Sequence, residues 1–243
     1  MEINNQVNLH LFSCVQLFEK YPSLIDHIEQ YCNDNPWEIG EQNNHGWTPV
    51  HFSAFYSNFS NYLKVLSILV NSRTANSKIL SLKTFGYGFT PLHLSVMHLH
   101  NENGIMALKL LIENGVNVNE VSTRDGSTAL HILIKTIHAQ NNCPSIVYKK
   151  LAIEMLIKAG THLRLLDKNG YSVLHLLATR SDVLVIKEIL KKLIDWGINF
   201  FDTDQKSVVF HLSNELQGYL GNKLKWNAID TDDIEKRDLA SKL

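Results

Sequence analysis

The chain has 243 residues, of which 44% are hydrophobic and 19% charged. Lys and Arg number 23 and Asp and Glu 24, so no net charge favours nucleic acid or a membrane surface as a partner. The three cysteines lack metal-ligand spacing, and no apolar stretch has the length of a membrane span. The N-terminus also lacks the basic start and apolar run of a secretory signal. We therefore expect a cytoplasmic location.

The first part of the chain predicts a pair of helices. Residues 9–19 and 23–32 are amphipathic, and Tyr21-Pro22 separates them. The run Asn33-Asp34-Asn35-Pro36 is expected to break the chain after the second helix.

A short phrase then recurs four times. The copies are Gly-Trp-Thr-Pro-Val-His at 46–51, Gly-Phe-Thr-Pro-Leu-His at 88–93, Gly-Ser-Thr-Ala-Leu-His at 126–131 and Gly-Tyr-Ser-Val-Leu-His at 170–175. A worn fifth copy, Gln-Lys-Ser-Val-Val-Phe, follows at 205–210. Self-similarity of this kind indicates stacked repeats, which build an extended surface that binds other macromolecules.

The residue types predict how each copy folds. Glycine suits a tight turn, the short hydroxyl caps a helix, and proline fits the first helical position. The turn glycines are Gly46, Gly88, Gly126 and Gly170, and the capping residues are Thr48, Thr90, Thr128, Ser172 and Ser207. A second helix is expected at 63–70, 106–113, 152–158 and 183–194, with stops at Gly115, Gly160 and Gly197.

With these features the sequence resembles the ankyrin-repeat family, whose unit is a finger turn, a Thr-Pro-Leu-His inner helix and an outer helix ending in Gly. Residues 110–119 and 156–160 are similar to the second half of that unit, and the resemblance covers about residues 41–212. It implies an all-α solenoid of stacked helix-turn-helix units with extended finger turns and helical caps at both ends. The expected divisions are an N-terminal cap at 1–42, repeats at 43–84, 85–122, 123–166 and 167–201, and a degenerate fifth repeat with a cap helix at 202–243.

The repeats are longer than the family unit of about 33 residues. The capping hydroxyls are spaced by 42, 38, 44 and 35 residues. We place the extra residues in a lengthened finger at 73–83 and in an insert between helices at 137–148. Two interpretations stay open, because inserted loops often carry function but also cost little free energy.

A helix expected at 216–224 completes the worn fifth repeat. A last helix is then predicted to begin at Thr231, with acidic residues in its first turn. The chain closes on Ser241-Lys242-Leu243, which matches a peroxisomal address and leaves that location as an alternative.

No catalytic or metal constellation stands out. One histidine recurs at the same repeat position, as His51, His93, His131 and His175. The family resemblance implies that these rings hydrogen-bond the neighbouring turn backbone and are structural. We predict no enzyme activity, no cofactor and no metal. The alternative is that the repeats are the targeting half of an enzyme, with its chemistry in the inserts or in residues 213–243.

The resemblance also implies a binding face, made of turn residues and the exposed ends of the inner helices. By register this face contains Trp47, Phe55, Tyr56, Phe89, Met97, His98, Ser127, Lys135, Tyr171 and Arg180. Aromatic side chains gather at one end and Lys135 and Arg180 at the other. We predict a partner protein with apolar anchors and an acidic portion. Packing of the aromatic residues between repeats is the alternative.

Irregular, stretched repeats and frequent Asn, Lys and Ile resemble ankyrin proteins that intracellular bacteria secrete into host cells. We therefore expect a monomeric effector that binds a host protein, without nucleic acid or membrane partners. An endogenous adaptor and an oligomeric scaffold are the alternatives. For the N-terminal segment an F-box-like adaptor helix is a further alternative, although the expected Leu-Pro opening is missing.

Overall fold

The computed structural model describes residues 11–17, 20, 23–72, 75–137, 145–180, 184–196, 198, 200, 208 and 212–224. The chain forms two compact units, Met1–Val173 and Leu174–Leu243. The fold is all-α, as the sequence predicts. In the described part of the chain, no helix combines the length and the apolar character that crossing a bilayer requires.

The first unit begins with a helical cap made of α1 (Leu11–Leu17), α2 (Leu24–Asp34) and the 3-10 helix η1 (Pro36–Gly40). The buried carboxylate of Glu38 joins all three, because it accepts hydrogen bonds from the Leu11 backbone N–H and the Tyr31 hydroxyl, both at 2.8 Å. Burial of the Tyr31 hydroxyl beside Glu38 raises its pKa to about 12. A cap of this kind protects the end of a repeat stack.

The predicted bounds of this cap need correction. Residues 11–17 of the predicted helix 9–19 form α1, and its predicted ends lie outside the described residues, whereas α2 continues past residue 32 to Asp34. Asn35 follows the helix as its C-cap residue, and its N–H still donates to Tyr31 O at 2.8 Å. Polar residues 33 and 34 therefore extend the helix, since exposed asparagine and aspartate lower helix propensity without excluding a helix.

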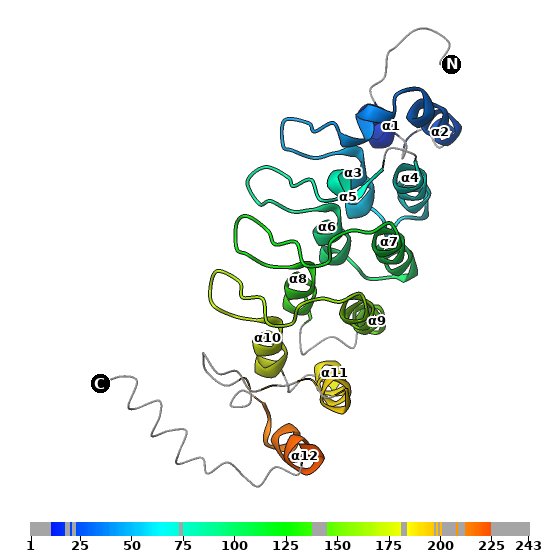
Figure 1. The fold of residues 1–243 in the computed structure, drawn as a ribbon. Helices are drawn as coiled ribbons and strands as arrows, with labels where there is room; N and C mark the ends of the chain where they lie inside the picture. Colours follow the sequence, from blue (N-terminus) through cyan, green and yellow to red (C-terminus); the bar gives the residue numbers. More distant parts are fainter. Residues whose placement is uncertain are drawn as a thin grey trace. The chain divides into compact units, whose positions relative to one another are not determined.

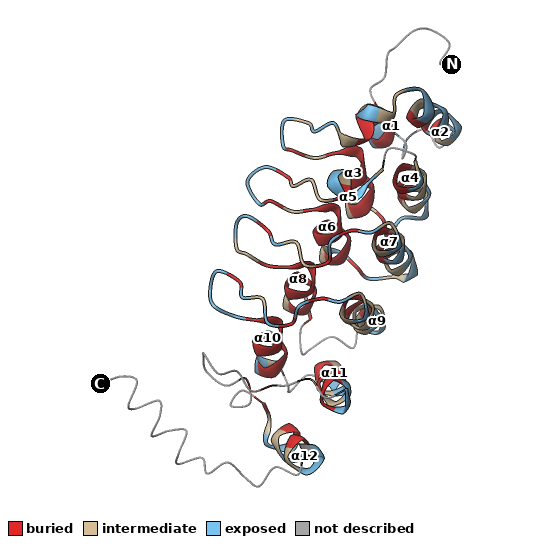
Figure 2. Cartoon of the chain, viewed as in Figure 1, coloured by how far each residue is buried: buried red, intermediate tan, exposed pale blue. Residues whose placement is uncertain are grey.

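Three helix pairs follow the cap. The inner helices are α3 (Pro49–Phe55), α6 (Pro91–Met97) and α8 (Ala129–Lys135), and the outer ones are α4 (Ser60–Asn71), α7 (Glu102–Glu113) and α9 (Ser145–Lys158). Figure 1 shows them as two columns, with the finger turns projecting from the side of the inner helices. The inner helices are buried almost throughout, and the outer helices bury the side that faces them (Figure 2).

Each inner helix begins directly after its predicted capping threonine. The outer helices begin earlier than predicted. The first turns of α4 and α7 are mostly polar and carry no apolar periodicity, whereas α9 begins with Ser145-Ile146-Val147-Tyr148, inside the segment predicted as an insert. In α7, for example, the Asn101 side chain accepts a hydrogen bond from the Gly104 N–H at 3.1 Å. The predicted stops Gly115 and Gly160 have φ angles of 78° and 88°.

The inserts contain more helix than predicted. In the segment 73–83 the chain forms α5 (Ser77–Leu80), capped by the Asn76 side chain, which accepts from the Ile79 N–H at 3.0 Å. Leu80 is buried, so this segment is partly packed and is not simply a longer finger. In the segment 137–148, residues 145–148 form the first turn of α9. Residues 138–144 lie outside the described part.

The second unit contains α10 (Val173–Thr179), which begins at the boundary, α11 (Leu184–Asp195) and α12 (Asn214–Leu224). Glu215 of α12 forms ion pairs with Lys187 and Lys191 of α11, and Lys223 pairs with Asp195 at 2.9 Å. Several predictions fall outside the described residues, namely Gly197, Ser207 with most of the fifth copy, the helix from Thr231 and the closing Ser241-Lys242-Leu243.

The turn glycines allow successive fingers to approach closely. Gly88 has φ +69°, and a Cβ atom there would lie 2.1 Å from Thr123 Oγ1 and 2.5 Å from Thr123 N in the next finger. Gly86 has φ +78° but open space around it. A side chain at position 86 would therefore introduce backbone strain alone. A side chain at position 88 would also clash with Thr123.

Gly86→Ala is expected to cost about 1–2 kcal/mol of unfolding free energy through left-handed strain. Gly88→Ala should cost clearly more, because the finger of residues 122–127 must also move away. Urea unfolding of both variants measures the difference. Equal losses would show that the close approach of the two fingers adds nothing.

Candidate functional site

The repeated Thr–His pair has a defined protonation. The Thr48 backbone N–H donates to His51 Nδ1 at 3.1 Å, so Nδ1 is the unprotonated ring nitrogen. The proton of the neutral ring therefore lies on Nε2, which is 3.0 Å from Leu82 O and 3.1 Å from Phe89 O. The imidazole of one repeat thus donates to the backbone of the next finger.

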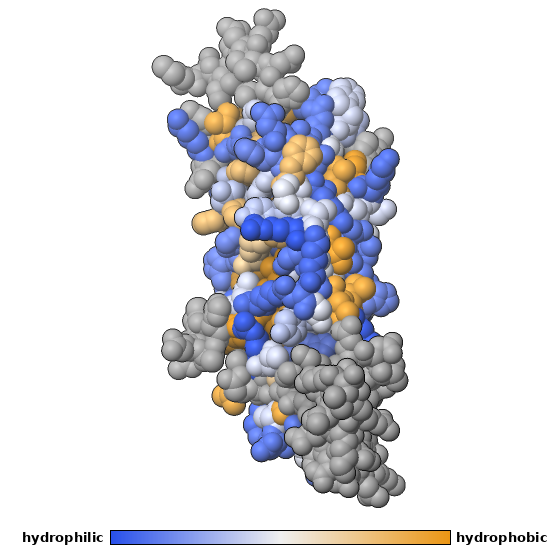
Figure 3. All heavy atoms as spheres, turned by 90° about the vertical axis from the view of Figure 1, so that its left-hand side faces the viewer, coloured by the Kyte–Doolittle hydropathy of each residue, from blue (hydrophilic) through white to orange (hydrophobic). Residues whose placement is uncertain are grey.

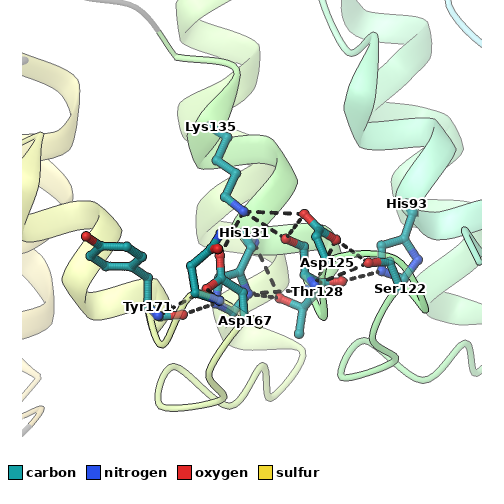
Figure 4. A network of polar contacts seen from close by, with 10 residues as sticks. His93, Ser122, Asp125, Thr128, His131, Lys135, Asp167 and Tyr171 are labelled. Carbon is teal, nitrogen blue, oxygen red and sulfur yellow. Dashed lines mark hydrogen bonds and ion pairs between the residues drawn. The ribbon is translucent and has the colours of Figure 1, made fainter. Parts of the chain in front are cut away.

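The same arrangement recurs along the first unit (Figure 4). His93 accepts from the Thr90 N–H at 3.1 Å and donates to Ser127 O at 3.0 Å. His131 accepts from the Thr128 N–H at 3.2 Å and donates to Tyr171 O at 3.2 Å. In every case the acceptor is the residue just before the next helix cap. Ser172 and His175 occupy the corresponding positions at α10, and both are buried.

The fingers are of two kinds, a difference that the repeated Gly-x-Thr phrase does not predict. In the short fingers, Asn43 and Asp167 stand three residues before the glycine. The Asn43 side chain accepts from His45 N and Trp47 N, and Asp167 accepts from Asn169 N and Tyr171 N. Asn and Asp at this place are a known turn signal, so the sequence contains the information.

The long fingers use hydroxyls instead. Thr84 and Ser122 stand four residues before the glycine, and their side-chain oxygens accept from Phe89 N at 3.0 Å and Ser127 N at 3.2 Å. The buried hydroxyl thus replaces the amide or carboxylate of the short fingers. Both kinds close the turn and expose its tip.

A polar network joins the third and fourth fingers (Figure 4). The ammonium of Lys135 lies 2.9 Å from Asp167, 3.5 Å from Asp125 and 2.9 Å from Ser127 Oγ. Ser127 in turn donates to Asp125 at 2.7 Å, and the Ser122 hydroxyl also donates to Asp125. This network shows why two predicted contact residues behave differently from expectation.

Ser127 is fully buried, so its side chain presents no surface for the partner contact that the register predicts. Lys135 is already paired with two carboxylates, and the charge of these three groups together is −1. It therefore does not offer the free cation that the predicted acidic portion of a partner needs. The sequence register identified where these residues lie but not that Asp125 and Asp167 would engage them.

The two carboxyls of the network titrate abnormally low. Partial burial acts to raise the pKa of Asp125, but the Ser122 and Ser127 hydroxyls, the Ser127 N–H and Lys135 outweigh it and lower the pKa. Burial likewise opposes the change at Asp167, where Lys135 and two backbone N–H groups lower the pKa. Both groups are therefore carboxylates throughout the neutral range.

The Ser127–Lys135 contact superficially resembles a catalytic serine–lysine pair. Two features argue against that role at this place, because Ser127 has no exposed surface and the Lys135 ammonium is held by carboxylates. Within the described ranges, no group of three or more His, Cys, Asp or Glu side chains is arranged to hold a metal ion.

The aromatic residues of the predicted face do come together. Phe55 lies at the centre, 5.5 Å from the Trp47 ring, 4.9 Å from Tyr56 and 4.6 Å from the His98 ring at the end of α6. We call Trp47, Phe55, Tyr56 and His98 the aromatic face. Its members are half-buried or, for His98, exposed, so the rings pack on one another and still reach the surface.

Two further rings extend this packing and were not predicted. Phe52 lies 4.7 Å from Tyr56 and 5.8 Å from Phe12 of α1, which joins the aromatic face to the cap. Both belong to an apolar helix pattern that a core would also produce, which explains why the sequence did not single them out.

The other predicted residues lie elsewhere. Met97 is half-buried at the end of α6, and Phe89 stacks on Tyr87 at 5.3 Å and on His93 at 5.9 Å. Tyr171 is 44% exposed in the fourth finger. Arg180 lies just after α10, in the second unit.

Comparisons with known proteins agree with this architecture. A family model described as "Ankyrin repeat" matches residues 87–123. The chain is also similar to the crystal structure of the ankyrin repeat domain of Bcl-3, described as a unique member of the IkappaB protein family. That likeness has a TM-score of 0.62 at 17% identity and covers 92% of this chain and 86% of that one. A search of curated proteins found no matching relative.

The buried histidines predict acid sensitivity. Burial lowers the pKa of His51 and of His93 to about 4, against an ordinary value of 6.5. The folded state therefore excludes protons that the unfolded state binds below pH 6.5. The free energy of unfolding should therefore have its full value above pH 6.5. Between pH 6.5 and 4 it should fall by roughly 1.4 kcal/mol per pH unit for each ring.

Urea unfolding at pH 7, 6, 5 and 4.5 measures this slope. His93→Gln removes one titrating ring and should reduce the slope. Stability that stays constant from pH 7 to 5 would contradict the neutral, buried state of these rings.

The network predicts that removing Lys135 alone is more destabilising than removing Lys135 together with the charge of Asp167. Lys135→Met leaves the Asp167 carboxylate, whose side chain is 1% exposed, without its cation and should cost about 2–3 kcal/mol of unfolding free energy. Adding Asp167→Asn should recover part of this loss, because the amide oxygen still accepts from the backbone.

A double-mutant cycle by chemical unfolding measures the coupling. Lys64→Met on the exposed surface of α4 is the matched control, with an expected change within about 0.5 kcal/mol. If Lys135→Met costs no more than this control, the pairing with Asp167 does not stabilise the fingers.

Proposed function

We propose that the chain is an ankyrin-repeat protein and a non-catalytic binding module, which holds a partner protein on the concave face formed by its fingers and inner helices. Repeat folds of this kind present an extended surface in place of a pocket. The aromatic face is the observation that supports this site best.

The composition of the aromatic face suits an interface centre. Trp, Tyr, Phe and Met are enriched there, and tryptophan and tyrosine frequently dominate the binding energy. The rings of Trp47, Phe55 and Tyr56 already contact one another, so little side-chain freedom would be lost on binding. Met97 stands at the end of α6, immediately before His98 of the aromatic face.

The partner chemistry that this face favours is apolar. A side chain such as Leu, Phe or Trp on the partner could contact the half-buried rings and lose its water. The acidic portion predicted from Lys135 and Arg180 is not retained for this face, because Lys135 is engaged by Asp125 and Asp167. Packing between repeats accounts for the Phe55–His98 contact but leaves part of the rings exposed.

For the biological setting we propose an effector that acts on a host protein, in the cytoplasm of the host cell. The stretched spacing of the repeats and the resemblance to ankyrin proteins of intracellular bacteria support this proposal. An endogenous adaptor would use the same aromatic face. A partner from a host cell would support the effector proposal, and a partner from the protein's own cell would support the adaptor.

The test compares three proteins as bait in eukaryotic cell lysate, with capture read by mass spectrometry. They are the wild type, the double variant Trp47→Ala/Phe55→Ala, and Trp37→Ala, which removes a 62% exposed tryptophan from η1. We expect a partner that the wild type and Trp37→Ala retain and that the double variant loses. With the purified partner, the loss should be at least tenfold in Kd.

Circular dichroism and unfolding midpoints must show that the double variant remains folded. A partner that binds all three proteins equally would show that the aromatic face only packs the repeats together. If Trp37→Ala loses the partner and the double variant keeps it, the binding site lies at η1 and not at the aromatic face.

A further inference from the structure

The tips of the second, third and fourth fingers carry a second group of exposed side chains. Phe85 is 60% and Tyr87 50% exposed on the second finger, and Arg124 and Lys168 are exposed on the next two. We call these four residues the fingertip patch. Seen from the finger side, the middle of the first unit shows strongly hydrophilic side chains beside apolar ones (Figure 3). Large exposed aromatic rings next to cations commonly mark an interaction surface.

Backbone hydrogen bonds hold the fingers that carry the patch in register. Phe85 N donates to His45 O at 2.9 Å, Arg124 N to Tyr87 O at 3.2 Å and Lys168 N to Asp125 O at 2.8 Å. Each bond connects one finger to the next. The patch is thus presented on a rigid support, which reduces the entropy lost on binding.

The guanidinium of Arg124 lies 4.4 Å from the centre of the Tyr87 ring. This cation–π contact orients the planar group over the ring and leaves its N–H edge available for a planar acceptor. Among the residues that the structure describes, no carboxylate lies within 4.0 Å of this guanidinium. The guanidinium of Arg124 is therefore held in place by the Tyr87 ring, and its N–H donors are available for a ligand.

The carboxylates of the same fingers are engaged elsewhere. Asp125 and Asp167 pair with Lys135, and Glu120 pairs with Lys83 at 3.0 Å. Lys168 donates to Thr123 O at 2.7 Å, and an ammonium has three donors, so it also has capacity left. The cations of the patch therefore face solvent, whereas each neighbouring carboxylate already contacts an ammonium group within the protein.

We propose that the fingertip patch binds an acidic segment of a partner protein, in which an Asp or Glu carboxylate accepts from Arg124 and an adjacent large apolar side chain contacts Phe85 and Tyr87. A carboxylate matches the fork of the guanidinium, and the exposed rings beside it match an apolar neighbour. The proposal rests on the proposed function only in that the partner is a protein.

A nucleic acid fits this surface less well. Its binding depends on many cations along a phosphate backbone, whereas the patch has two, and Asp125, Asp167 and Glu120 lie on the same fingers. The net charge of −1 for the chain points the same way. A single carboxylate next to an apolar group needs only one cation beside an exposed ring, which Arg124 and Tyr87 provide.

The test is selection from a random peptide display library on the full-length chain. The wild type should enrich peptides with Asp or Glu next to Phe, Trp or Leu. Arg124→Glu should bind these peptides at least tenfold more weakly, and its own selection should enrich Lys or Arg in place of the acid. Arg124→Lys keeps the charge but loses the fork and should be intermediate.

The matched control is Lys64→Glu, the same charge reversal on the exposed surface of the outer helix α4, which should bind the selected peptides as the wild type does. Arg124 is exposed, so its variants should show wild-type circular dichroism. Selection of no peptides, selection without acidic enrichment, or equal binding by Arg124→Glu would each overturn the proposal. Nucleic acid captured by the wild type but lost in Arg124→Glu would overturn it in favour of that class.

The same peptides separate this proposal from that for the aromatic face. Binding lost in Arg124→Glu but kept in Trp47→Ala/Phe55→Ala supports the fingertip patch and shows that these peptides do not use the aromatic face. The opposite pattern refutes the fingertip patch and leaves the aromatic face as the binding site.

Discussion

The hydrogen bond from a buried imidazole to the backbone of the following finger is the contact on which the first unit depends. His51, His93 and His131 each accept from the cap of their own helix and donate to the next repeat. One ring therefore joins the start of a helix to the neighbouring turn. Because each ring has one donor and one acceptor, the contact defines both the tautomer and the direction of the repeat stack.

This arrangement has a cost that follows from burial. A ring inside the protein must stay neutral, since its surroundings supply carbonyl acceptors on one side and an N–H donor on the other. Protonation would place a hydrogen on Nδ1 against the Thr48 or Thr90 N–H. The stability of the stack and its acid sensitivity thus have the same origin.

The sequence predicts the fold well because each repeat contains the residues that form its own turn and helix start. Glycine, threonine, proline and histidine in the same order predict the turn, the cap, the first helical residue and the buried ring. The prediction fails where the chain departs from that order. The polar first turns of α4 and α7 and the short helix α5 have no apolar periodicity to reveal them. The starts of α5 and α7 depend on a single asparagine cap.

The candidate site was predictable in position but not in chemistry. Register located Trp47, Phe55, Tyr56 and His98, which the structure brings into contact. Register could not show that Ser127 would turn inward, because that depends on Asp125, Asp167 and Lys135 from three different segments. Register alone also does not distinguish the short fingers from the long ones. That distinction requires comparing how many residues separate the Asn, Asp, Thr or Ser from the following glycine.

The finger residue before each cap explains how such a fold can serve different partners. Its carbonyl accepts from the preceding histidine, whatever side chain it carries, as Phe89, Ser127 and Tyr171 show. The side chain of the same residue is then free to differ between repeats: Phe89 stacks on Tyr87, Tyr171 is exposed, and Ser127 joins a polar network. The backbone of the finger maintains the stack while its side chains determine the chemistry of the surface. Substitutions at these positions can therefore change what the protein binds without removing the contact that holds the repeats together.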